Sequence, residues 1–427
     1  MSRIKSWRAL LPLFFIALLP VGTASARENP EKLFSYLRDI YNRHDKNLHD
    51  YLLAELNQYV AQFADSGKTA EAQYLMARVY QEKGDKQKAA AAFLKTIYLY
   101  PGTSWQQEAA KEARQMIAED GSFKEKRAKL SALIDGTPKD RAPADRDYEY
   151  LNAAPMLDNS EVYGLLAEEA RKFLILFPDD ARQDTTILKM AEFYAKKGDK
   201  HEAEVSYLRL EYCCAESPLL PAARYSRGAL LSKELGDHKT AVQVLGELAA
   251  KNPQSEYAAL AIFKTGEIKK EKMKDYGGAI ADYRRFVETG ADSVKAVDAL
   301  WAIAEINTDN TKDYGGAIAA YSEIVEKHKS DKRAIAAFER IGDVYKDKLA
   351  DYNKAAEQYV KMAEVFPYYE KAPELILKAG SLCEEKLKDY KRAKDYYYIV
   401  LDKFPQHKSA DEARKKIEKV RAKAEQQ

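Results

Sequence analysis

The chain has 427 residues, a formal net charge of +2 at pH 7 and 32% charged residues. This length suits two or three globular domains or one long array of repeats. Because positive and negative charges nearly balance, the composition gives no reason to expect nucleic acid as a partner, and none to expect direct binding to an anionic membrane.

The first residues have the features of an export signal. Basic residues precede the apolar run 9–21, and the small residues Ala24-Ser25-Ala26 follow it. This order is typical of a cleaved signal peptide covering 1–26, so that the mature chain begins at Arg27. A retained anchor is the alternative, although the run is shorter than the roughly 20 residues of a membrane span. No cysteine near the cleavage site could accept a lipid. We therefore expect a periplasmic protein that meets the membrane only indirectly, through an envelope complex.

Residues 27–119 are predicted to be helical. Residues 31–64 have the pattern of one or two amphipathic helices, a helical hairpin is expected at about 68–101, and another helix at 103–119. The pattern then fails, because the segment 120–160 contains prolines and charged residues without a helical period. We expect an irregular connector there, either a flexible linker or an ordered strap against the array that follows.

A seven-residue phrase, KDYGGAI, occurs at 274–280 and again at 312–318, thirty-eight residues later. At this spacing an alanine recurs, and four residues after it stands a tyrosine or leucine. The alanines are Ala203, Ala241, Ala279, Ala317, Ala355 and Ala393. Residues four apart share one face of a helix. The pattern therefore predicts the second helix of a hairpin packed against the first.

Other residues at the same spacing support the hairpin. A small residue in each first helix would let the two helices approach closely, and proline ends several second helices. The small residues are Gly228, Gly266, Ala304, Gly342 and Gly380. Asp275, Asp313, Asp351 and Asp389 are placed to cap the second helices. The two glycines of the repeated phrase indicate either the recent duplication of one repeat or a close backbone contact.

These offsets resemble those of the tetratricopeptide repeat (TPR) family. The resemblance implies an all-α fold, a solenoid of antiparallel helical hairpins over 161–407, with a capping helix at 408–427. The period of thirty-eight residues exceeds the family's usual period of about 34 and predicts longer turns. HEAT-type helical repeats are the alternative, but they do not predict the alanine, aromatic and proline offsets.

The resemblance also implies that the first helices line a concave groove. Three residues before the small residue stand Tyr225, Phe263 and Trp301, and one residue after it stand Glu267, Glu305 and Asp343. These would form an aromatic column beside an acidic column. Aromatic residues can anchor a peptide, and carboxylates favour a partner with lysine or arginine. Alternatively, the aromatic rings pack between helices and the carboxylates form a solvated surface.

Motifs for catalysis or cofactor binding are absent from the sequence. It has no haem-attachment, zinc-protease, phosphate-loop or nucleophile-elbow motif, and its six histidines are scattered. We therefore expect no catalytic residues, no metal site and no cofactor, and we interpret the protein as non-enzymatic.

Two functional hypotheses remain. The segment 253–268 is similar to repeats of two bacterial envelope families, the TPR lipoprotein of the outer-membrane β-barrel assembly machinery and the soluble TPR protein of the Tol–Pal system. The missing lipid-acceptor cysteine argues against the first, and the missing N-terminal coiled coil argues against the second. What carries over is a scaffold for a protein or peptide partner in cell-envelope assembly or maintenance. The alternative is a glycan- or peptidoglycan-binding accessory protein that uses the aromatic column as sugar platforms.

Overall fold

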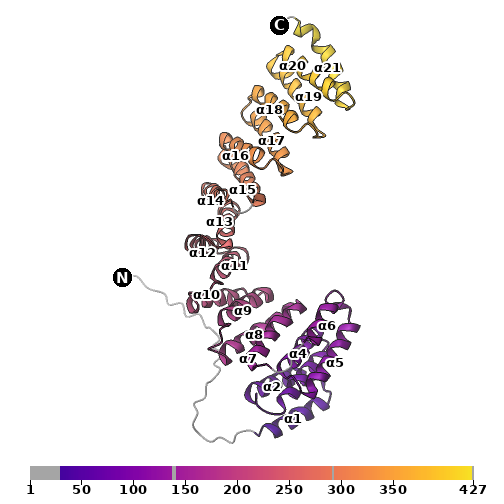
Figure 1. The fold of residues 1–427 in the computed structure, drawn as a ribbon, viewed down its shortest axis with the longest axis vertical. Helices are drawn as coiled ribbons and strands as arrows, with labels where there is room; N and C mark the ends of the chain where they lie inside the picture. The colour runs from indigo at the N-terminus through magenta and orange to yellow at the C-terminus, as the bar shows by residue number, and fades with distance from the viewer. Residues whose placement is uncertain (1–28, 137–140, 291–292, 426–427) are drawn as a thin grey trace, which may run out of the picture. The chain divides into compact units, whose positions relative to one another are not determined.

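The computed structural model describes residues 29–136, 141–290 and 293–425, so the expected signal peptide at 1–26 lies outside the described residues. Within them the secondary structure is helical and contains no β-strand, which confirms the predicted fold class. The chain divides into two compact units, Met1–Val162 and Tyr163–Gln427 (Figure 1). No helix in the described ranges is long and apolar enough to cross a membrane.

The first unit begins with helices that follow the amphipathic pattern. They are α1 (Pro30–Asn42), α2 (His49–Gln62), α3 (Thr69–Glu82), α4 (Lys86–Leu99) and α5 (Ser104–Glu119). Helices α3 and α4 form the expected hairpin and pack against each other. Ala89 and Phe93, at the alanine and aromatic positions of its second helix, are both completely buried. The core of this unit therefore uses the same pair of positions as the repeats further along the chain.

The segment expected to be irregular contains ordered helices, so that expectation is wrong. Helix α6 covers Arg127–Asp135, and α7 covers Pro143–Ala153. Pro143 lies in the first turn of α7, where its missing N–H group costs no hydrogen bond. Tyr150 and Leu151 are buried, and α7 packs against α4 of the same unit. Pro143 therefore begins a helix here, and α7 is an ordered strap over the N-terminal hairpin.

The second unit is a stack of antiparallel hairpins in which each helix lies against the next (Figure 1). Helix α8 (Ser160–Leu176) spans the boundary between the units. The first helices of the hairpins are α9 (Gln183–Lys197), α11 (Leu220–Leu230), α13 (Glu256–Ile268), α15 (Ser293–Glu305), α17 (Arg333–Asp343) and α19 (Ala372–Leu382). The second helices are α10 (Lys200–Cys213), α12 (His238–Lys251), α14 (Tyr276–Thr289), α16 (Tyr314–Lys327), α18 (Tyr352–Val365) and α20 (Tyr390–Lys403), and α21 (Ser409–Ala424) packs on α20.

In three of the hairpins an aromatic ring of the second helix lies against a glycine of the first helix. The six repeated alanines of the second helices are completely buried. A Cβ atom built on Gly342 would lie 2.4 Å from the ring of Tyr359, and one on Gly380 would lie 2.3 Å from the ring of Tyr397. These separations are far below van der Waals contact, so no larger residue fits beside the ring. The small residue is therefore the close-contact point, as the spacing predicts.

Aspartate side chains cap the second helices. In each case one carboxylate oxygen accepts a hydrogen bond from the backbone N–H three residues later, which satisfies a donor that the first helical turn leaves unpaired. The caps are Asp237 on Thr240, Asp275 on Gly278, Asp313 on Gly316, Asp351 on Lys354 and Asp389 on Arg392. The four capping aspartates expected from the sequence are confirmed.

Five of the six first helices, α11, α13, α15, α17 and α19, end in a π-helical turn, which the sequence analysis did not predict. These turns are η4 (Leu231–Leu235), η5 (Lys269–Met273), η6 (Ile306–Thr311), η7 (Val344–Lys348) and η8 (Cys383–Leu387). In α9, which has no such turn, the buried Ala191 stands twelve residues before Ala203. In the next hairpin Gly228 stands thirteen residues before Ala241. A π turn accommodates one inserted residue, because its hydrogen bonds span five residues instead of four.

The expected longer turns are therefore not found within the hairpins. Two or three residues separate each π turn from the second helix. Gly236 follows the first π turn with a positive φ of 73°, and Lys274, Lys312, Ala350 and Lys388 repeat this left-handed conformation at thirty-eight-residue spacing. A left-handed residue is a common way to end a helix and reverse the chain. The additional residue extends the first helix instead of the turn.

The glycine pair of the repeated phrase makes no close backbone contact. A Cβ atom on Gly277 would meet nothing within 4 Å, and the three atoms nearest to one on Gly278 would all belong to the side chain of its own cap, Asp275. Lys354 and Arg392 occupy the position of Gly278 in later repeats. The structure thus favours duplication of a repeat as the origin of the phrase.

We expect Ala317→Leu to destabilise its hairpin by about 1–3 kcal/mol, the usual cost of overpacking a filled core. Ala317 is completely buried, whereas Ala319 on the same helix is exposed. Ala319→Leu should therefore cost much less, and it is the matched control because leucine and alanine are both good helix formers. Chemical denaturation of the two variants measures the difference. Equal losses would show that the helix register is wrong.

Candidate functional site

The six residues predicted to line the groove lie on consecutive first helices of the second unit. Tyr225 is on α11, Phe263 and Glu267 on α13, Trp301 and Glu305 on α15, and Asp343 on α17. All six are half-buried. An aromatic residue and the carboxylate four residues after it share one face of a helix. We call the surface formed by these six residues the groove face.

The aromatic rings of the groove face each contact a second ring. Trp301 meets Tyr321 of α16 at 5.2 Å between ring centroids, and Phe263 meets Tyr283 of α14 at 5.5 Å. Tyr225 meets Tyr257 at 5.7 Å. Such tilted and edge-to-face arrangements are favourable ring contacts. Each ring is thus partly packed into the hairpins and partly accessible. The sequence left two alternatives open, rings exposed in the groove and rings packed between helices, and the observed rings are intermediate between them.

The carboxylates of the groove face are bonded to nearby donors. Glu305 accepts a hydrogen bond from the Trp301 indole N–H at 2.9 Å and pairs with Lys270 Nζ at 3.0 Å. Glu267 pairs with Lys264 on its own helix at 2.9 Å. Lys270 lies one hairpin before Glu305, so this ion pair links neighbouring repeats. The sequence analysis missed Lys270, because its contact with Glu305 depends on how adjacent hairpins pack.

Asp343 has the most completely bonded carboxylate of the three. It accepts a hydrogen bond from Tyr359 at 2.7 Å and one from Lys378 of the next hairpin at 2.9 Å. Burial raises the pKa of Asp343, but the bonds from Tyr359 and Lys378 lower it more, so the pKa lies below its usual value. Asp343 therefore carries its negative charge at neutral pH and shares it with two donors.

Glu305 and Asp343 meet at a hollow of about 250 Å³. Asp309 and Asp347 also line it, together with Tyr321, Arg340 and Lys348 among other residues. Asp309 and Asp347 stand four residues after the two predicted carboxylates and thirty-eight residues from each other. That spacing was a usable signal that the sequence analysis did not exploit. The four carboxylates outnumber the two cationic side chains at this hollow.

The position of the hollow strengthens its negative potential. Asp309 lies in η6 and Asp347 in η7, at the carboxyl ends of two first helices. A helix carries a partial negative charge at this end, which favours a bound cation. Burial is the largest cause that raises the pKa of Tyr321, and together with the opposing charge of Arg340 and the negative charges of Glu305 and Asp309 it brings that pKa to about 12. Within the described part of the chain, no group of three or more metal-ligating side chains is arranged to hold a metal ion.

Comparison with known proteins finds a known repeat in three segments of the chain. The family model for the tetratricopeptide repeat matches residues 71–103, 222–255 and 374–407. These segments cover α3–α4, α11–α12 and α19–α20, which are hairpins in both units. No curated protein matches the sequence.

Several solved structures are similar at low identity. A tetratricopeptide repeat protein from Parabacteroides merdae ATCC 43184 is 14% identical, with 65% of this chain and 96% of that chain covered, at a TM-score of 0.34. Yeast Tom70 is 12% identical, with 93% and 90% covered, at a TM-score of 0.31. A Rap protein complexed with competence and sporulation factor is 14% identical, with 91% of this chain and 99% of that chain covered, at a TM-score of 0.32. The repeat assignment rests on the matched segments and their residue pattern, not on these structures.

Proposed function

We propose that this chain, in which three hairpins match the tetratricopeptide repeat, is a scaffold that binds a protein or peptide partner on the groove face. The observation that carries this proposal is the hollow where Glu305, Asp309, Asp343 and Asp347 converge, next to the half-buried Trp301, whose indole N–H bonds Glu305. A partner segment with lysine or arginine and an apolar residue fits this chemistry. Its cation would form charge-assisted hydrogen bonds with the carboxylates, and its apolar side chain would lie against the indole ring.

A partner's cation can displace the lysines that are bonded to the carboxylates of the groove face. Lys270 and Lys378 each bridge one carboxylate to a neighbouring hairpin. Both side chains are long and partly exposed, and an exposed ion pair contributes only about 0–1 kcal/mol. A partner's arginine, which can bind a carboxylate through two parallel hydrogen bonds, could replace such a lysine at little cost.

We also propose that the protein is exported and acts in the cell envelope. This rests on the basic, apolar and small residues that follow one another in 1–26. The expected mature N-terminus is Arg27. N-terminal sequencing of the protein recovered from the periplasmic fraction tests it. A soluble protein that retains Met1 would contradict both the cleavage and the export.

One experiment separates the scaffold from the glycan-binding alternative. The full chain, immobilised, is incubated with envelope extract, and in parallel the free protein is sedimented with purified peptidoglycan. The scaffold hypothesis expects a protein partner that is retained by the native chain and lost with Glu305→Lys. Co-sedimentation with peptidoglycan that depends on Trp301, without a retained protein, would instead establish the glycan-binding function.

A further inference from the structure

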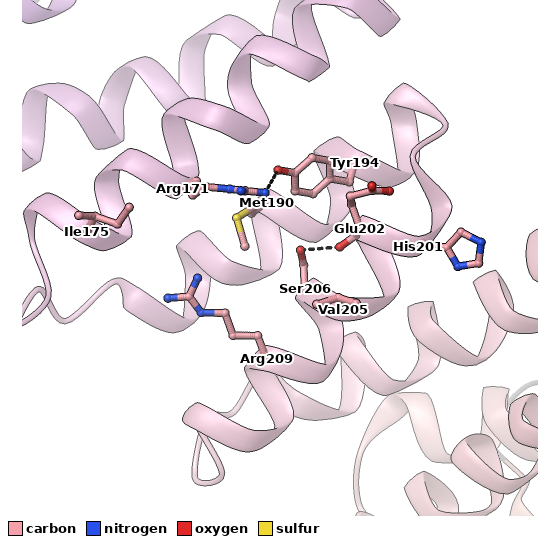
Figure 2. A pocket seen from close by; sticks show the side chains of 9 residues that line it. All are labelled: Arg171, Ile175, Met190, Tyr194, His201, Glu202, Val205, Ser206 and Arg209. Atoms are coloured by element: carbon pink, nitrogen blue, oxygen red, sulfur yellow. Dashed lines mark hydrogen bonds between the residues drawn. The ribbon is translucent and has the colours of Figure 1, made fainter. Parts of the chain in front are cut away.

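A second hollow, of about 440 Å³, lies in the second unit between α8, α9 and α10 (Figure 2). Helix α9 contributes Met190 and Tyr194 to it. In the other first helices the acidic column stands one residue after the small residue. In α9 the small residue is the buried Ala191, so the corresponding position is Glu192, which is two residues from both Met190 and Tyr194. Two residues along a helix correspond to a rotation of about 200°. The hollow therefore opens on the side of the hairpins opposite to the groove face.

The walls of this hollow are apolar and accessible. Ile175 of α8 is 67% exposed and Val205 of α10 is 64% exposed, while Met190 is buried beneath them. Burying a side chain of this kind stabilises a complex because it removes apolar surface from water. The volume is within the range of about 300–1,000 Å³ that is typical of ligand clefts. The hollow can thus receive an apolar side chain.

Cationic side chains stand at its rim. Figure 2 shows Arg171 and Arg209 on either side of Met190. Arg171 donates a hydrogen bond to the Tyr194 hydroxyl at 2.5 Å, and its closest carboxylate, that of Glu168, is 3.9 Å away. Arg209 is exposed and has no ion pair or hydrogen bond with any residue that the structure describes. Its guanidinium group is therefore available for an external carboxylate.

The neighbouring hollow shows a different arrangement of charges. It has a volume of about 320 Å³, lies between α10, α11 and α12, and is lined by Arg224, Arg227 and Glu211 among other residues. There Glu211 pairs with Arg224 at 3.3 Å and with Arg227 at 3.2 Å. The arginines of that hollow are neutralised within the chain. The hollow between α8 and α10 combines exposed apolar walls with an unneutralised arginine.

We propose that the hollow between α8 and α10 is a second docking surface, which takes a protein segment bearing an apolar side chain close to aspartate or glutamate. The apolar side chain would enter between Ile175 and Val205, and the carboxylate would bind Arg209, with Arg171 as a second donor. Glu202 lines the other end of the hollow and would repel an acidic residue there, which sets the direction of the segment. The preferred charge is opposite to that of the groove face, so this surface does not depend on the proposed function.

The test selects a displayed library of random twelve-residue peptides on the full chain, with the Val205→Glu variant as the counter-selection. We expect enriched peptides to combine a large apolar residue with aspartate or glutamate within one helical turn. Binding of the best peptide is then measured by fluorescence anisotropy. Arg209→Glu and Val205→Glu should each weaken it by at least about tenfold, because one removes the charge partner and the other places a charge in the apolar wall.

Matched controls lie elsewhere in the same unit. Val294 is 60% exposed, so Val294→Glu makes the same substitution at a comparable surface position. Arg285 is exposed on α14, and Arg285→Glu is the control for Arg209. Both controls should bind the peptide as the native chain does, and all four variants should keep the native melting temperature.

Three outcomes would overturn the proposal. The first is enrichment of peptides without acidic residues, or of none at all. The second is binding that is lost with Glu305→Lys and kept with Arg209→Glu, which would place the peptide on the groove face. The third is self-association in analytical ultracentrifugation that Val205→Glu abolishes, because the occupant would then be a second copy of this chain.

Discussion

Replacing Tyr397 with alanine should destabilise the C-terminal end of the second unit by about 3–5 kcal/mol, as expected for deleting a large aromatic side chain from a core. Tyr397 is completely buried and its ring fills the space above Gly380. Its hydroxyl donates a hydrogen bond of 3.0 Å to the buried Glu384. The alanine variant would therefore leave both a cavity and a carboxylate with one donor fewer.

The adjacent residue is the control for this prediction. Tyr398 lies on the same helix and is 50% exposed, so Tyr398→Ala should cost far less. In an array of repeats each hairpin contacts only its neighbours, and the loss should be concentrated in α19, α20 and α21. Hydrogen exchange of their backbone amides measures it locally. Equal protection in the two variants, or a loss spread evenly over the unit, would contradict the prediction.

The same contact predicts that acid loosens the C-terminal helix. Glu384 pairs with Lys419 of α21 at 2.8 Å. Burial raises the pKa of Glu384, but the bonds from Lys419 and Tyr397 outweigh it, so the pKa is lowered from its usual 4.5. A lowered pKa in the folded state stabilises the fold above pH 4.5, and this contribution is lost as the pH falls further. Exchange in α21 should rise on acidification, and Glu384→Gln should weaken this dependence. An unchanged acid response in the variant would exclude Glu384 as its source.

Residue spacing was sufficient to predict the hairpins because it reports on packing within one repeat. The buried alanine, the aromatic residue four positions later and the small residue of the first helix all meet inside a single hairpin. Tyr359 against Gly342 is an example. Local capping is equally predictable, since Asp351 needs only the backbone three residues away. These features depend on short separations along the chain.

The sequence analysis missed the π turns, helix α7 and the contacts between adjacent hairpins. The π turns insert a residue within a helix, and a hydrophobic pattern does not distinguish such an insertion from a longer turn. Helix α7 was missed because Pro143 was interpreted as a break, although its position in the first turn is compatible with a helix. Lys270 and Lys378 reach carboxylates of adjacent hairpins, and their contacts depend on the angle between hairpins.

Trp301→Ala should weaken binding of a partner on the groove face by about 2 kcal/mol or more, roughly 30-fold, which is typical of an aromatic residue at the centre of an interface. The indole ring is half-buried and contacts Tyr321, so the variant will also lose some stability. That loss should be smaller than the 3–5 kcal/mol of a fully buried aromatic side chain. Trp301→Phe, which keeps a ring but removes the N–H bonded to Glu305, should recover most of the stability.

Glu305→Lys should act on the rate of association. The substitution places a cation beside Lys270 and reverses the charge at the acidic hollow. Exposed charges steer an encounter at low ionic strength and are screened beyond about 10 Å at 0.1 M salt. The association rate for a basic partner should thus fall strongly at low salt and only slightly at high salt, while Trp301→Ala should mainly raise the dissociation rate.

Two substitutions outside the groove face are the controls for these rates. Glu288 is exposed on the second helix α14, so Glu288→Lys adds the same charge away from the hollow. Tyr368 is a fully exposed aromatic residue between α18 and α19, so Tyr368→Ala removes a ring that packs on nothing. Surface plasmon resonance with the partner recovered from envelope extract measures all four variants. If the partner contacts this hollow, only substitutions at the groove face should change its association and dissociation rates. Rates that change as much in the two controls as in Glu305→Lys and Trp301→Ala would therefore rule out the groove face as the binding surface.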